Sequence, residues 1–146
     1  MNAIVELYEQ DFYAWTLKNA ELLRQGRLGE IDLEHLAEEL ESMGRSEKRE
    51  LINRLAVLLA HLLKWHVQAN RRGRSWQLTL KEQRRQAARV LRDNPSLRPL
   101  LAEIVAEAYE DAILRAAQET GLEESAFPAS CPFSLERILD ENFLPD

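Results

Sequence analysis

Three histidines are the side chains of this sequence that most readily bind a metal ion or move a proton near neutral pH. His61 and His66 lie five residues apart in a segment with helical periodicity, so their rings point about 140° apart around the helix axis. One metal ion does not readily take both rings at that angle, and the Glu-x-x-His sequence of di-iron helix bundles is absent. We therefore expect His61 to be a core histidine bonded to a carbonyl or a carboxylate, and His66 also to be structural.

His35 lies in the densest group of carboxylates in the chain. The members of this group are Glu34, His35, Glu38, Glu39 and Glu41. His35 shares a helix face with Glu38 and Glu39, and together they could hold a divalent cation. They could equally form the exposed acidic start of a helix, which the helix dipole favours. We expect the second arrangement, with ion pairs to later basic residues. The candidate partners are Arg45, Lys48 and Arg49.

Two further sets of side chains could react but are expected to be structural. Acidic and aromatic residues occur together early in the chain, at Tyr8, Glu9, Asp11, Tyr13 and Trp15. Aromatic residues at helical spacing are more typical of a core than of a site. Cys131 has no second cysteine and no neighbouring base, so we expect a small buried residue rather than a reactive thiol or an intermolecular disulfide.

The clearest binding signal is a basic block inside an acidic chain. Residues 45–98 carry 14 basic and 4 acidic side chains, whereas 1–44 carry 3 and 10, and 99–146 carry 2 and 11, for a net charge of −6. We favour internal ion pairing between these blocks. The alternative is contact with nucleic-acid phosphates through residues 71–92, with a tryptophan stacked on a base. The residues concerned are Arg71, Arg72, Arg74, Trp76, Lys81, Arg85, Arg89 and Arg92.

Apolar residues recur with the helical period along most of the chain, and no segment alternates as a half-buried strand does. We predict four main helices, of which the second runs to about residue 70 and contains Gly44. The periodicity continues past Gly44, and a kink or a break there stays open. The apolar stretch Leu55–Leu63 predicts that this helix is central. The expected N-caps are Asp32, Ser75, Ser96 and Ser134, and the expected helix stops are Gly26 and Gly121.

These elements predict one all-α domain over residues 1–146. Its architecture is a four-helix bundle with mostly antiparallel neighbours, plus a short C-terminal helix and an extended tail packed on it. An apolar content of 45% with 30% charged residues excludes a chain that is disordered throughout. One cysteine excludes an intrachain disulfide framework. The sequence lacks the order of a signal peptide and an apolar run long enough to cross a bilayer, so we expect a cytoplasmic protein without membrane contact.

Segments spread along the chain resemble the bacterial domain of unknown function family 29. They are residues 7–15 (LYEQDFYAW), 38–49 (EELESMGRSEKR), 62–65 (LLKW), 74–76 (RSW), 95–97 (PSL), 108–112 (AYEDA) and 131–133 (CPF). The resemblance covers nearly the whole chain, in order. It implies a small all-helical bacterial protein, with cyanobacteria prominent in the family, and it supplies no activity and no site residues.

The residues leave three functions open. The leading hypothesis is a non-catalytic, self-associating interaction module, such as a two-fold homodimer in which an acidic block of one copy meets a basic block of the other, or one that binds an unidentified protein. The second is nucleic-acid binding through residues 71–92. The third is a metal-dependent enzyme that uses His35, His61 or His66 with helix-borne carboxylates. No assembled catalytic set and no cofactor motif is present, which favours a protein that is not an enzyme.

Overall fold

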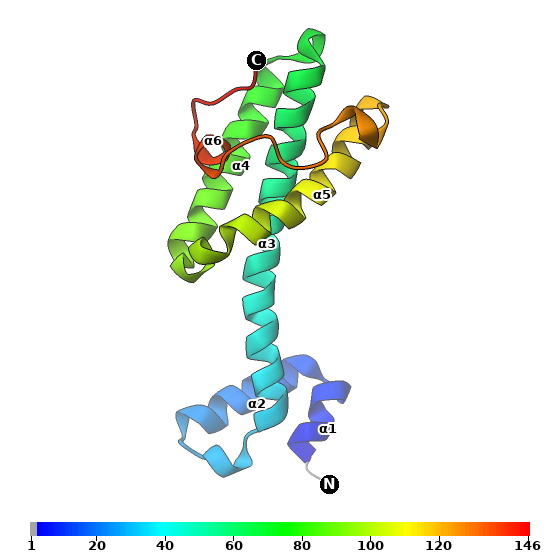
Figure 1. The fold of residues 1–146 in the computed structure, drawn as a ribbon. Helices are drawn as coiled ribbons and strands as arrows, with labels where there is room; N and C mark the ends of the chain where they lie inside the picture. The colour runs from blue at the N-terminus through cyan, green and yellow to red at the C-terminus, as the bar shows by residue number, and fades with distance from the viewer. Residues whose placement is uncertain (1–2) are drawn as a thin grey trace. The chain divides into compact units, whose positions relative to one another are not determined.

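The computed structural model describes residues 3–146, and within that range the chain is helical without a β-strand (Figure 1). The all-α helical bundle that the sequence predicts is therefore confirmed. The helices are α1 (Ala3–Gln10), α2 (Phe12–Arg24), α3 (Leu33–Val67), α4 (Arg74–Asp93), α5 (Leu101–Thr120) and α6 (Leu135–Leu139). Four short 3₁₀ turns connect them, η1 (Leu28–Glu30), η2 (Ala69–Arg71), η3 (Pro95–Leu100) and η4 (Glu124–Ala126).

The chain forms two compact units, one ending at Arg45 and the other spanning Ser46–Asp146. Each unit has an apolar cluster of its own. The first cluster is small, because within residues 3–45 its buried side chains are those of Ile4, Trp15 and Leu22. The second cluster collects buried residues from α3, α4, α5 and the C-terminal segment. A single domain over the whole chain therefore stays a prediction.

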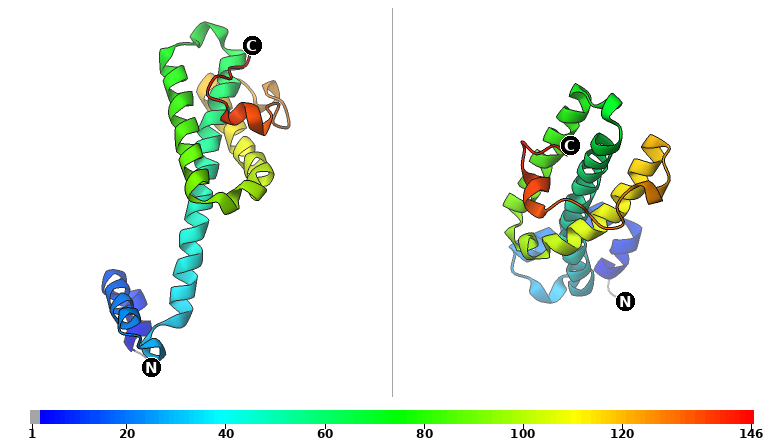
Figure 2. Two further views of the ribbon diagram at one scale, coloured as in Figure 1. Left: turned by 90° about the vertical axis from the view of Figure 1, so that its left-hand side faces the viewer. Right: turned by 45° about the horizontal axis from the view of Figure 1, so that its top comes forward.

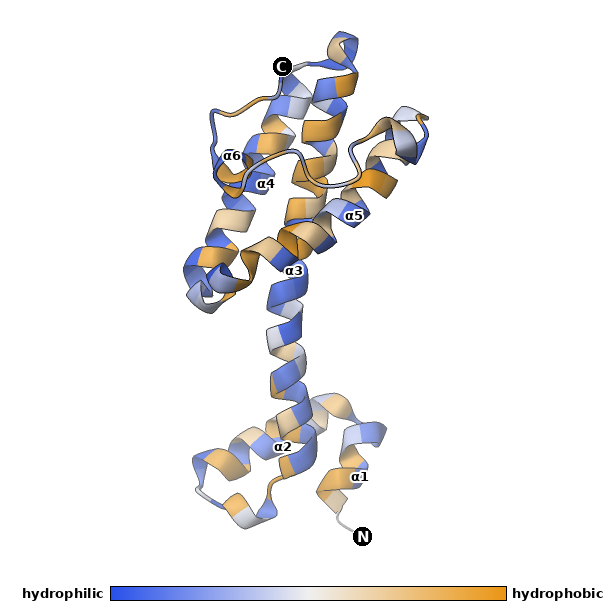
Figure 3. Ribbon diagram, in the orientation of Figure 1, coloured by the Kyte–Doolittle hydropathy of each residue, from blue (hydrophilic) through white to orange (hydrophobic). Residues whose placement is uncertain are grey.

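The second unit is built around the last two-thirds of α3. Leu55, Leu58, Leu59 and Leu62 are fully buried there, because this part of the helix is apolar nearly all round. The hydrophobic bands on this stretch are visible in Figure 3. Helix α4 returns beside it in the opposite direction, and α5 crosses it, as the views of Figures 1 and 2 agree. The central position predicted for this helix is thus what the structure shows.

The C-terminal segment packs back onto the second unit, as predicted. Phe127 is buried, and the rings of Phe133 and Phe143 meet with centroids 5.8 Å apart against the same core. The phenol of Tyr109 donates a hydrogen bond to the carbonyl of Pro128 at 2.6 Å. The position of the extended segment is therefore fixed by side chains of α5 and of the core as well as by α6.

The first predicted helix is in fact two helices, which meet at Asp11. This residue leaves the helical conformation, with φ −155° and ψ 89°, and its carboxylate accepts a hydrogen bond from the Ala14 backbone N–H at 3.0 Å. Asp11 is therefore the N-cap of α2. The aromatic rings still meet across the break, since the Tyr8 and Trp15 centroids lie 5.0 Å apart. The end of α2 at Gly26 is confirmed, because φ there is 72°.

Four of the predicted helix ends are right and two are wrong. Asp32 and Ser134 cap α3 and α6 with their side chains, and Gly26 and Gly121 end α2 and α5 with positive φ. Ser75 lies inside α4 instead, where its carbonyl accepts a hydrogen bond from Thr79, and Gly73 is the N-cap. Ser96 lies in η3, whose 3₁₀ geometry accommodates the two prolines, and α5 begins only at Leu101.

Helix α3 passes Gly44 without a break. The helix is 35 residues long, and a Cβ at position 44 would meet no atom within 4 Å. The glycine therefore serves neither a turn nor a close contact within the described chain. No helix of residues 3–146 is long and apolar enough to cross a membrane.

Candidate interaction surfaces

The exposed face of α4 carries most of the residues that the sequence singled out. Five cationic side chains lie within about 80° of each other around the helix axis, because their spacing follows the helical period. They are Arg74, Lys81, Arg85, Arg89 and Arg92, and all five are exposed. We call this set the α4 basic face. The opposite side of α4 packs into the core through Leu80, Ala87 and Leu91, which fixes the direction of the cations.

Two carboxylates lie beside the α4 basic face, those of Glu82 and Glu141, but neither forms an ion pair with its cations. The glutamates of α5 pair with basic residues of α3 instead: Glu103 with Lys48 at 3.4 Å, Glu107 with Arg49 at 3.5 Å, and Glu119 with Lys64 at 2.7 Å. Within residues 3–146, none of the five cations of the α4 basic face makes an ion pair with a carboxylate. The internal pairing predicted from the charge blocks therefore occurs on α3 and not on α4.

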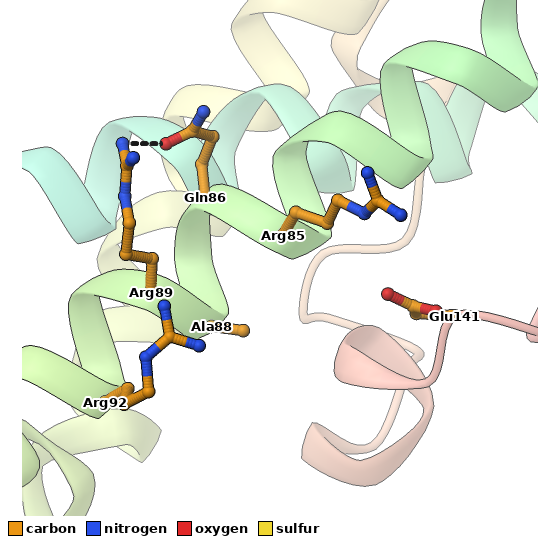
Figure 4. Close-up of a pocket in the computed structure, with 6 residues that line it drawn as sticks. All are labelled: Arg85, Gln86, Ala88, Arg89, Arg92 and Glu141. Atoms are coloured by element: carbon orange, nitrogen blue, oxygen red, sulfur yellow. Dashed lines mark hydrogen bonds between the residues drawn. The ribbon is translucent and has the colours of Figure 1, made fainter.

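A hollow of about 450 Å³ lies between the α4 basic face and the segment that follows α6. Its lining residues are Arg85, Gln86, Ala88, Arg89, Arg92 and Glu141. Figure 4 shows three guanidinium groups projecting from α4, with the Glu141 carboxylate across from Arg85. Arg89 donates a hydrogen bond to the Gln86 amide oxygen, so its guanidinium keeps other donors free. A second hollow lies beside Lys81 and Arg84, and Glu141 is again part of its wall.

The remaining predicted nucleic-acid contacts are in other surroundings. Arg72 is half-buried and donates hydrogen bonds to the carbonyls of Trp65 at 2.7 Å and of Asp146 at 2.8 Å. Trp76 is also half-buried, with the Lys64 ammonium 4.8 Å from the centre of its ring and His61 edge-on to it. Its ring is thus already in contact with protein. Arg71 is exposed in η2, next to α4 in sequence.

Arg84, which the sequence places among the basic residues of α4, holds the C-terminal segment in place. It is 3% exposed, and its guanidinium donates to the carbonyls of Ile138 at 2.9 Å and Arg137 at 3.3 Å. Burial lowers the pKa of this guanidinium, and the charges of Asp140 and Glu141 act in the opposite direction. These contacts fix the end of α6, and with it the wall that Glu141 forms.

The first unit contains a polar network that the sequence did not predict as such. The buried Asp32 carboxylate accepts hydrogen bonds from Trp15 Nε1 at 2.9 Å and from His35 Nδ1 at 2.7 Å. Its backbone N–H donates to Asn19 Oδ1 at 2.9 Å, and the Asn19 amide donates to the Trp15 carbonyl. Of the three basic residues expected to pair with the acidic group around His35, Arg45 does so, at 3.8 Å from Glu41, while Lys48 and Arg49 pair with α5. His35 instead pairs with Asp32, one turn earlier.

The network holds His35 between a carboxylate and a ring. The hydrogen bond to Asp32 raises the pKa of His35, although partial burial acts against it. Burial disfavours the charged form of Asp32, but the hydrogen bonds from His35 and Trp15 outweigh this and lower its pKa. The Tyr8 ring stacks on the His35 ring with centroids 3.8 Å apart, and its hydroxyl donates to Glu39 at 2.5 Å. That hydrogen bond raises the pKa of Tyr8 to about 12.

The first unit also exposes much of its apolar surface. Of the fifteen large apolar side chains that are exposed among the described residues, nine belong to positions 3–45. Three of these lie along α3, with exposed fractions of 69% for Leu33, 65% for Leu40 and 64% for Met43. With the half-buried Leu36 they form a row that we call the α3 stripe. Leu36 packs against the apolar cluster of the first unit, whereas α1 contacts the adjacent face of α3, where Tyr8 meets His35 and Glu39.

The other candidate reactive groups are structural or isolated. His61 is half-buried and bonds to the Val57 carbonyl at 3.0 Å, which confirms the predicted bond to a carbonyl, and burial lowers its pKa. His66 is exposed at the end of α3. Cys131 is half-buried beside the Phe133 carbonyl, and burial raises the pKa of its thiol. In the part of the chain that the structure describes, no three His, Cys, Asp or Glu side chains converge as metal ligands would.

Comparison with known families identifies the chain. Residues 7–144 match the domain of unknown function DUF29, so the protein belongs to this family. The match runs through both compact units. No curated protein and no solved structure matches the chain significantly. The family has no assigned function, and the surfaces described above are therefore what a functional assignment has to start from.

Proposed function

Since the chain belongs to the DUF29 family, for which no activity is assigned, we propose a function from its surfaces: a non-catalytic helical interaction module that self-associates through the α3 stripe. The observation that carries this proposal is the exposure of Leu33, Leu40 and Met43 on one face of a long helix. Leucine side chains left in water at such fractions lose the free energy that burial would provide, about 1.5–3 kcal/mol each.

The spacing of the α3 stripe is that of a helix–helix seam. Leu33, Leu36, Leu40 and Met43 are separated by three, four and three residues, which is the a/d pattern of a coiled coil. Ala37 and Gly44 lie beside this row on the same face. Small residues at those positions allow a second helix to approach closely. The pattern therefore favours a helix as the occupant.

The small core of the first unit supports the same conclusion. Among residues 3–45, three large apolar side chains are buried and nine are exposed. Units of this size seldom stabilise themselves with a single core and commonly gain stability by oligomerisation. A second copy of this chain offers an identical stripe, and a two-fold axis would pair the two stripes with each other. We therefore assign the stripe to a homodimer contact.

The test is the molar mass of purified protein by size-exclusion chromatography with light scattering. We expect a dimer for the unmodified chain and a monomer for Leu40→Glu, because a carboxylate in the seam would be buried without a partner. Leu114→Glu is the matched control, since Leu114 is 56% exposed on α5 and outside the stripe. A monomeric unmodified chain would overturn the proposal, as would an equal response of the two variants.

A further inference from the structure

The α4 basic face has the form of a linear array. From Arg74 to Arg92 it extends about 27 Å along the helix axis, at 1.5 Å per residue. Four of its five cations are arginines, whose planar guanidinium groups bind phosphate oxygens in pairs. A row of separate cations along a rigid helix suits a partner with regularly repeated negative charges. A nucleic-acid backbone has this property.

An acidic protein surface fits the same face less well. Protein–protein interfaces depend on a central cluster of apolar or aromatic side chains with a polar rim. On the exposed side of α4, the apolar residues are Leu78 and Ala88, and charged and amide side chains surround them, the carboxylate of Glu82 included. Such a face would supply steering charge to a protein partner but little buried apolar area.

The surroundings of α4 favour a double strand over a single strand. Proteins that bind single strands stack bases on free aromatic rings. Trp76 is the aromatic residue of α4, and it is half-buried between Lys64 and His61. Base stacking would require it to leave these contacts. Phosphates of a duplex can be reached without any such change.

We infer that the α4 basic face binds the phosphate backbone of double-stranded nucleic acid. This goes beyond self-association, because it uses a different helix, in the second unit, and a different chemistry. If all five cations contact phosphates, the logarithm of the affinity falls with the logarithm of salt concentration with a slope of about −4 to −5. Glu141, at the wall of the hollow, opposes the binding of phosphate there.

The experiment is fluorescence anisotropy with a labelled 24-base-pair DNA duplex, the matching RNA duplex, the DNA single strand and poly-glutamate, from low to physiological salt. The variant is Arg85→Gln with Arg89→Gln, which removes two charges without introducing any. Its matched control is Arg24→Gln with Arg115→Gln, two exposed arginines on α2 and α5. Circular dichroism checks that both variants are folded.

We expect a duplex to bind at low salt, and either DNA or RNA fulfils this expectation. The Arg85/Arg89 variant should bind the duplex at least about tenfold more weakly, and the magnitude of its salt slope should decrease by about two. The control variant should keep the affinity and the slope of the unmodified chain. Three results would overturn the inference: no duplex binding at low salt, tighter binding of poly-glutamate or of the single strand, or an equal loss in both variants.

Discussion

The indole Nε1 of Trp15 donates a hydrogen bond of 2.9 Å to the carboxylate of Asp32, and both side chains are almost completely buried. Asp32 is also the N-cap of α3, where its other oxygen accepts the His35 backbone N–H. One carboxylate thus caps α3 and joins it to α2. Within residues 3–45 few apolar side chains are buried, so this buried hydrogen bond is a main link between α2 and the start of α3.

We expect Trp15→Phe to destabilise the first unit by about 2 kcal/mol. The substitution keeps an aromatic ring but removes the donor to a buried charged group, a loss that typically costs 1.5–3 kcal/mol. Chemical denaturation followed by circular dichroism measures the change. Trp76→Phe is the control, because no hydrogen bond of the Trp76 indole nitrogen occurs among residues 3–146. If Trp15→Phe lowered the free energy of unfolding no more than Trp76→Phe does, the hydrogen bond between Trp15 and Asp32 would not be important for stability.

His35 should give the first unit a pH dependence of a defined sign. Its pKa is raised in the folded state, chiefly by the hydrogen bond to Asp32, so protonation favours folding. The stabilisation is complete below the ordinary histidine pKa of 6.5 and is lost as the pH rises through the raised value. An NMR titration of the His35 ring should give a midpoint above 6.5, and Asp32→Asn should lower it. A midpoint at or below 6.5 in the unmodified chain would refute this assignment.

His61 should act in the opposite direction in the second unit. Burial lowers its pKa, so folding favours the neutral ring. The stability that depends on this neutral ring is present above pH 6.5 and decreases as the pH falls toward the lowered value. We expect the His61 ring to titrate below 6.5 in the NMR experiment that follows His35. Titration of both rings on the same side of 6.5 would show that one of the two environments is wrongly described.

Replacement of Glu141 tests the site on α4 through a gain of affinity. Glu141→Gln removes the negative charge from the wall of the hollow beside Arg85 and leaves a side chain of the same size. We expect the duplex to bind several-fold more tightly at low salt, and the difference to shrink as salt screens the charge. Glu110→Gln, an exposed change on α5, is the control. Unchanged affinity for Glu141→Gln would place the duplex away from the hollow.

Two glycine substitutions should have opposite effects on stability. Gly44→Ala adds a methyl group in open space inside α3 and should stabilise the helix by about 1 kcal/mol. Gly121→Ala forces a non-glycine residue to φ 75° at the end of α5 and should destabilise the chain by about 1 kcal/mol. Thermal unfolding at low protein concentration, where the dimer contact contributes least, measures both. If both substitutions changed the stability in the same direction, either the continuous helix at Gly44 or the left-handed cap at Gly121 would be wrong.

The elements of the second unit could be predicted because their pattern is local. The stripe of α5, with Ile104, Ala108 and Ala112 fully buried, follows directly from the helical period. The break at Asp11 could not be predicted in the same way, because the apolar spacing continues across it. An aspartate is tolerated in a helix and also caps one, and only the hydrogen bond to Ala14 distinguishes the two.

The functional surfaces depend on which helices become neighbours, and periodicity does not determine this. The charge blocks predicted pairing between basic and acidic helices, and α5 indeed pairs with Lys48, Arg49 and Lys64. The sequence could not show that, because α5 pairs with α3, the α4 basic face is left without carboxylate partners. Likewise, Leu40 has the spacing of a core residue, but α1 packs on the adjacent face of α3 through Tyr8 and leaves Leu40 exposed.

Sedimentation equilibrium of the unmodified protein, over a wide range of concentrations and at both low and high salt, tests self-association through the α3 stripe most directly. An apolar seam is strengthened rather than screened by salt. We predict a mass that approaches twice the 16.9 kDa of the chain with rising concentration under both conditions. A mass of one chain throughout would contradict the account, and a dimer that dissociates at high salt would place the contact on charged surfaces instead.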